Sequence, residues 1–137
     1  MAKRILVPVD GSEESDRAVE FAAEEWPDAR ITLLHVINPA RSVSGAEMGV
    51  SGLTEDWYEN AERNAETLLS ETVERADIDA ETLVEVGRPV HTILEAADDF
   101  DGIVIGSQGR TGLSRVLLGS VAEGVVRKAE IPVTVVR

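Results

Sequence analysis

Two kinds of apolar pattern alternate along this chain from end to end. Short runs rich in β-branched residues, such as residues 5–7 and 103–105, alternate with longer stretches in which apolar residues recur every three or four positions. This alternation is typical of a parallel sheet with helices packed on its faces. The predicted fold class is therefore α/β: an open, doubly wound, mainly parallel five-stranded sheet of the Rossmann-like type, with helices on both faces.

The same patterns place the individual elements. Strands are predicted at residues 4–9, 31–36, 83–86, 103–105 and 131–136, and helices at residues 13–26, 54–76, 89–97 and 120–129. Ser12 is the predicted N-cap of the first helix, because a hydroxyl there accepts a main-chain amide and the following Glu13 and Glu14 suit the positive helix end. A chain of 137 residues suits one domain, residues 1–137, because a chain this long buries roughly 68% of its unfolded surface.

Composition excludes several classes of function. There are 26 acidic and 13 basic residues, so the formal net charge of -13 should repel nucleic acid. Cysteine is absent, which rules out disulfides, thiolate metal sites and a cysteine nucleophile. No apolar run approaches the roughly 18 residues that span a bilayer, and no signal peptide is recognisable, so a soluble, cytoplasmic protein without membrane contact is expected.

The basic residues are mostly arginine. Lys3 and Lys128 are the only lysines, and the other basic residues are arginine. Together with the acidic excess, this bias leads to the hypothesis of a halophilic protein that stays soluble in concentrated salt. An ordinary acidic surface is the alternative, and the response of the melting temperature to salt separates the two.

A glycine-rich segment follows the predicted fourth strand and leads into a helix. It reads Gly106-Ser107-Gln108-Gly109, then nine residues, then Gly119-Ser120. Glycines let the main chain turn its N–H groups towards a ligand, and the start of a helix offers free amides at its positive end, so this segment is a predicted phosphate site. Ser120 can serve there as N-cap or as a hydroxyl donor to phosphate. Ligands of doubly wound sheets bind beyond the carboxyl ends of the strands where the winding reverses.

Three segments together resemble the universal stress protein family. They are the G-x-x-G-x9-G-S pattern after the fourth strand, Val-Pro-Val-Asp-Gly-Ser at residues 7–12, and Ala-Glu-Ile-Pro-Val-Thr-Val-Val at residues 129–136. The resemblance spans almost the entire chain. In this family the complete glycine pattern accompanies ATP binding, so the resemblance implies an ATP-binding, nucleotide-dependent stress-response or signalling module, with Mg²⁺ or Mn²⁺ bound through the phosphates.

The resemblance also implies a role for each matching residue. Asp10 would accept hydrogen bonds from the ribose hydroxyls. Gln108 and Ala122 differ from the side chains that are frequent at these positions in the family, and this difference predicts weaker phosphate binding. Adenine would lie against Pro8, Val9 and the main chain of Val36; the ribose side would be closed by Ile105 and Gly106; the phosphates would be held by Gln108, Gly109, Gly119, Ser120 and Val121.

Other interpretations of the sequence are less well supported by its residues. The first turn lacks G-x-G-x-x-G, and neither lysine lies in the glycine-rich segment as a P-loop requires. Asp10 can also be explained as a turn residue, and His35 and His91 as structural histidines without a catalytic partner. A slow ATPase or nucleotide-transfer enzyme is the alternative function, although no residue is predicted as catalytic and no residue as a metal ligand.

The last predicted strand suggests a second partner besides the nucleotide. Its apolar residues are Ile131, Val133, Val135 and Val136, and only Arg137 follows them. An uncovered hydrophobic edge invites pairing with a second copy of the same strand. The resemblance points the same way, so a homodimer through this strand is expected.

Overall fold

The computed structural model describes residues 2–40, 55–107 and 118–137. Five parallel strands form its sheet, in the order β3-β2-β1-β4-β5. They are β1 (Arg4–Pro8), β2 (Arg30–Ile37), β3 (Ala80–Val86), β4 (Gly102–Gly106) and β5 (Val133–Val136). The winding therefore runs outward from β1 in one direction to β3 and then in the other direction through β4 to β5, which confirms the predicted open, doubly wound sheet.

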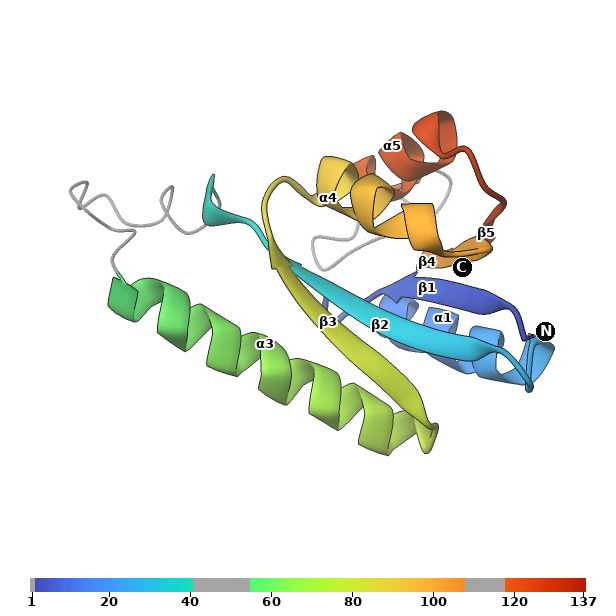
Figure 1. The fold of residues 1–137 in the computed structure, drawn as a ribbon, viewed down its shortest axis with the longest axis horizontal. Helices are drawn as coiled ribbons and strands as arrows, with labels where there is room; N and C mark the ends of the chain where they lie inside the picture. Colours follow the sequence, from blue (N-terminus) through green and yellow to red (C-terminus); the bar gives the residue numbers. More distant parts are fainter. Residues whose placement is uncertain (1, 41–54, 108–117) are drawn as a thin grey trace.

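Helices cover both faces of this sheet (Figure 1). They are α1 (Glu13–Glu25), α3 (Glu55–Ala76), α4 (Pro89–Ala96) and α5 (Ser120–Lys128), with a short 3₁₀ turn η1 (Ala97–Asp99) after α4. The long helix α3 and helix α1 pack on one face, and α4 and α5 pack together on the other. This three-layer arrangement is the one that alternating strands and helices predict.

The two faces share the central strand β1. Ile5 and Val7 belong to the cluster beneath α1 and α3, whereas Leu6 belongs to the cluster beneath α4 and α5. Because successive side chains of a strand point to opposite faces, a central parallel strand must be apolar at every position. All three side chains are at most 2% exposed, as the continuous apolar run predicted.

Most strand boundaries lie within one residue of the sequence prediction, and two strand starts differ by more. β3 begins at Ala80 instead of residue 83, because its main chain already pairs there with Ile31 of β2, although Glu81 and Thr82 are exposed and carry no apolar signal. β5 begins at Val133 instead of residue 131. The predicted cap Thr54 lies outside the described residues.

No helix in the described ranges is both long enough and apolar enough to cross a membrane.

Candidate functional site

The sheet reverses its winding between β1 and β4, and the ladder between these strands is short. The main chain of Arg4 faces β4, since its carbonyl accepts the N–H of Asp101 at 2.8 Å. Alternate residues of a strand face the same neighbour, so Leu6 and Pro8 face β4 as well. The strands pair at Ile5–Gly102 and Leu6–Ile103. Pro8 has no N–H, so no β1 amide continues the ladder beyond Leu6, and the carboxyl ends are free to diverge.

The connection from β1 to α1 is a tight hydrogen-bonded turn. Asp10 Oδ1 accepts the N–H of Ser12 at 3.0 Å, and Gly11 adopts φ +85°, a left-handed conformation that favours glycine. Ser12 Oγ accepts the N–H of Ser15 at 3.1 Å, which confirms Ser12 as the N-cap of α1. The side chain of Asp10 therefore stabilises this turn. A carboxylate offers about four acceptor positions, so holding this turn is compatible with binding a sugar hydroxyl.

Gly106 ends β4 directly against the first turn of α1. A Cβ added to Gly106 would lie 2.7 Å from the carbonyl carbon of Glu14 and 2.8 Å from its oxygen. The absence of a side chain at this position is therefore required by helix packing. The sequence pattern favours ligand binding over a simple turn as the reason for this glycine, and the structure adds helix packing as a further cause.

Ser107 connects the end of β4 to both β5 and α5. Its N–H donates to the carbonyl of Val136, and its carbonyl accepts the N–H of Gly119, each at 2.7 Å. The start of α5 is in this way held at the carboxyl end of β4. Ser107 is not among the predicted site residues, because a role that rests on main-chain atoms leaves no side-chain signal.

The start of helix α5 is built differently from that of α1. Its N-cap is Gly119, so the alternative that Ser120 caps the helix is wrong. Among the described residues, no side chain accepts a hydrogen bond from the first amides of the helix. The Gly119 amide, predicted to be free, is bound to Ser107. The N–H groups of Ser120, Val121 and Ala122 belong to the first turn, where a helix offers no acceptor of its own. An anion is stabilised at such a helix end.

The end of β2 completes the surroundings of the β1 terminus. The half-buried His35 places its Nδ1 2.8 Å from the carbonyl oxygen of Val9, and the Val9 N–H donates to the carbonyl of Leu34 at 2.8 Å. His35 is therefore a hydrogen-bonded structural histidine, as expected. His91 instead lies on the exposed side of α4, with Nε2 3.3 Å from Glu95 Oε2.

The predicted site residues gather at one end of the sheet. Those that the structure describes lie at the carboxyl ends of three neighbouring strands or at the start of α5: Pro8, Val9, Asp10, Val36, Ile105, Gly106, Gly119, Ser120 and Val121. Gln108 and Gly109 lie outside the described residues. Apolar walls, a carboxylate and helix-terminal amides thus border the point where the winding reverses. This combination suits a ligand with a flat apolar part, hydroxyl groups and an anionic tail.

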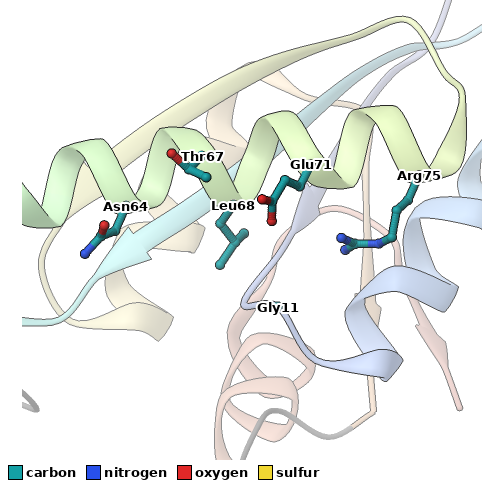
Figure 2. Close-up of a pocket in the computed structure, with 6 residues that line it drawn as sticks. All are labelled: Gly11, Asn64, Thr67, Leu68, Glu71 and Arg75. Atoms are coloured by element: carbon teal, nitrogen blue, oxygen red, sulfur yellow. The ribbon is translucent and has the colours of Figure 1, made fainter.

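A separate hollow of about 280 Å³ lies between α3 and the β1–α1 turn (Figure 2). Gly11 forms one side of it, and Asn64, Thr67, Leu68, Glu71 and Arg75 line it from α3. Arg75 Nη2 lies 3.0 Å from Asp16 Oδ1 and so links the two helices across this groove. None of the described residues predicted for the site lines this hollow, so we assign the site to the strand ends.

Comparison with known proteins decides the family. The model of the universal stress protein family matches residues 1–137. The chain belongs to the universal stress protein family. Universal stress protein MJ0577 of Methanocaldococcus jannaschii is 32% identical over 100% of this chain and 96% of its own length. Universal stress protein YxiE of Bacillus subtilis is 31% identical, with complete coverage of both chains.

Solved structures of this family share the fold. The structure of MJ0577 superposes with a TM-score of 0.74 at 33% identity, covering 99% of this chain and 96% of that one. A universal stress protein in complex with cAMP gives a TM-score of 0.68 at 27% identity, covering 98% and 96%. The architecture predicted from the sequence is therefore that of the family.

Proposed function

We propose that this universal stress protein binds an adenine nucleotide, ATP above all, at the carboxyl ends of β1, β2 and β4. The observation that carries the proposal is the position of the first turn of α5. The Gly119–Ser107 hydrogen bond holds this turn at the end of β4, one strand away from Asp10. Anion-binding amides and a sugar-binding carboxylate are thus placed on neighbouring strands.

Each part of the nucleotide has a matching group in the chain. The amides of Ser120 and Val121, with the Ser120 hydroxyl, would bind phosphate oxygens, and Asp10 would accept ribose hydroxyls. Pro8 and Val36 would lie against the base. The similar universal stress protein solved with cAMP supports an adenine nucleotide as the ligand class. Gln108 and Gly109 are proposed to complete the phosphate site.

A divalent cation would enter with the nucleotide. Within residues 2–40, 55–107 and 118–137, no three acidic or histidine side chains are grouped to hold a metal ion. Mg²⁺ is commonly bound through substrate phosphates with few protein ligands, and we propose the same arrangement for Mg²⁺ or Mn²⁺ here. Such a module would respond to the nucleotide in the cytoplasm, where ATP is made and used.

Calorimetric titration tests the binding proposal directly. Wild-type protein is titrated with ATP, AMP and GTP in the presence of Mg²⁺, and we expect adenine nucleotides to bind more tightly. Asp10→Ala should weaken ATP binding about tenfold or more, on the order of one charge-assisted hydrogen bond. Asp99→Ala, a change at an exposed position of η1, is the control. No heat and no ATP-dependent rise in melting temperature at millimolar ATP would refute the proposal.

Slow hydrolysis is tested in the same preparation. A module that only binds should release phosphate from ATP at the background rate. Turnover that rises above background and disappears in Asp10→Ala would show instead that the protein is an ATPase.

We further propose that the second partner is another copy of this chain. β5 is the outer strand of the sheet next to β4, and all four of its residues are half-buried. Val126, on the neighbouring helix α5, is 44% exposed. An apolar edge strand is a template for pairing with the same strand of another molecule.

A further inference from the structure

The end of the β1–β2 ladder departs from regular parallel pairing. In a parallel strand both main-chain groups of a residue point to one neighbour, and those of the next residue point to the other. The carbonyl of Leu34 receives the Val9 N–H, so Leu34 faces β1. The carbonyl of Ile37 receives the N–H of Gly87, just after β3, so Ile37 faces the opposite way. Val36 therefore faces β1.

A regular ladder would use the Val36 N–H to bind the carbonyl of Val9. That carbonyl is instead 2.8 Å from His35 Nδ1. A carbonyl oxygen only accepts, so Nδ1 carries the hydrogen in this contact. In the part of the chain that the structure describes, the Val36 N–H has no main-chain acceptor in its place.

We propose that His35 is a positioning residue, which takes the Val9 carbonyl out of the ladder and leaves the Val36 N–H for a ligand. The proposal rests on the nucleotide-binding function argued above. Val36 lies two residues beyond the last β1–β2 pair, Pro8–Leu34, and its main chain faces the side of β2 on which β1 and the candidate site lie. A donor beside an acceptor complements an edge of adenine, which presents a ring nitrogen acceptor beside an amino donor.

Two substitutions separate this role from simple packing. His35→Leu keeps an apolar body but removes the donor. His35→Asn keeps an N–H donor close to the position of Nδ1. His91→Leu, at the exposed histidine of α4, is the control that removes an imidazole elsewhere.

Amide hydrogen exchange of nucleotide-free protein is the first measurement. We expect the Val36 amide to exchange faster than that of Leu34 in the wild type and in His35→Asn. In His35→Leu the Val9 carbonyl can return to the ladder, so protection of the Val36 amide should rise about tenfold. Unchanged exchange at Val36 in His35→Leu would overturn the proposal.

Titration with ATP is the second measurement. His35→Leu should weaken binding about tenfold, whereas His35→Asn and His91→Leu should stay within about twofold of wild type. Equal losses in the Leu and Asn variants would show that the imidazole matters for packing only. If wild-type protein binds no ATP but the exchange result holds, the adenine-nucleotide function fails while the role of His35 in freeing Val36 stands.

Discussion

Gly106 shows how a single residue can serve two purposes at the end of β4. It borders the proposed nucleotide site, and it also allows the first turn of α1 to lie against the sheet. An added methyl group would come within 2.9 Å of three atoms of Glu14, two of them main-chain atoms. Main-chain atoms of a capped helix move only if the helix moves, so any side chain here is expected to disturb α1.

Gly106→Ala should therefore destabilise the fold even without nucleotide. Overpacking a buried site costs about 1–3 kcal/mol, and we expect a loss of this size in the free energy of unfolding by urea. Gly102→Ala is the matched control in the same strand, because its Cβ would meet Ile5 Cδ1 at an ordinary 3.5 Å. A Gly106→Ala protein as stable as Gly102→Ala would mean that the glycine is kept for the ligand alone.

At this scale the sequence predicted side-chain roles better than main-chain ones. Ser12 was correctly predicted as a cap and His35 as a bonded histidine, because hydroxyl and imidazole groups have few uses at such positions. The contacts of Ser107 and the closeness of Gly106 to Glu14 involve main-chain atoms distant in sequence. Only the assembled fold brings these atoms together, so no residue pattern records them.

Helices α1 and α5 begin in different ways, although serine stands near the start of both. In α1 the Ser12 hydroxyl accepts the Ser15 amide from the N-cap position. In α5 the N-cap is Gly119, and Ser120 is the first helical residue. The two helices therefore predict opposite results for the same substitution.

Ser12→Ala should lower the free energy of unfolding by about 1 kcal/mol, the usual cost of losing a side-chain cap. Ser120→Ala should change it by less than about 0.5 kcal/mol, since the residue is exposed and is not the N-cap. Urea denaturation measures both. We expect ATP titration to show the converse for Ser120→Ala, with weaker binding and unchanged stability; a stability loss equal to that of Ser12→Ala would contradict the assignment of Gly119 as N-cap.

The order and type of the elements followed from the sequence, whereas the starts of β3 and β5 were misplaced by more than one residue. Buried strands such as β1 and β4 are apolar throughout, so their patterns are unambiguous. β3 lies at the sheet edge, and its first residues pair with β2 through the main chain while their side chains face water. Hydropathy patterns therefore miss the residues of an edge strand whose side chains are exposed.

The charge of the whole molecule makes its stability depend on salt. A net charge of -13 means that folding brings like charges together. The described ion pairs, such as Arg75–Asp16 and Arg127–Glu123, join exposed or only half-buried side chains and contribute little. Salt shortens the screening length from roughly 30 Å at 0.01 M to 3 Å at 1 M. Because repulsive pairs outnumber attractive ones in this chain, salt should weaken the repulsion more than the attraction and so stabilise the fold.

We therefore expect the melting temperature to rise between 0.01 M and 1 M NaCl. A triple variant, Glu59→Gln, Glu62→Gln and Glu66→Gln, removes three exposed charges from α3. It should melt higher than wild type at low salt and close to wild type at 1 M. Scanning calorimetry measures both proteins. A melting temperature that is flat or falls with salt would contradict both the repulsion argument and the hypothesis of a halophilic protein.

Pairing of whole molecules would depend on the outer edge of β5. The carbonyls of Pro132 and Val136 accept amides of β4 and its extension, so Pro132, Thr134 and Val136 face the sheet. Val133 and Val135 alternate with them, and their main-chain N–H and C=O groups face away from β4. These outward groups are the ones that a second β5 would bind.

Val135→Pro should therefore break the proposed dimer and preserve the monomer fold. Proline removes one outward N–H and is tolerated on the free side of an edge strand. Thr134→Pro is the control, because it removes an amide directed at β4 and should lower the stability of the monomer itself. Sedimentation equilibrium gives the mass, and circular dichroism follows the fold. Because both substitutions introduce proline into the same strand, only the direction of the lost N–H distinguishes them. A Val135→Pro protein that keeps the dimer mass would place the interface on another surface.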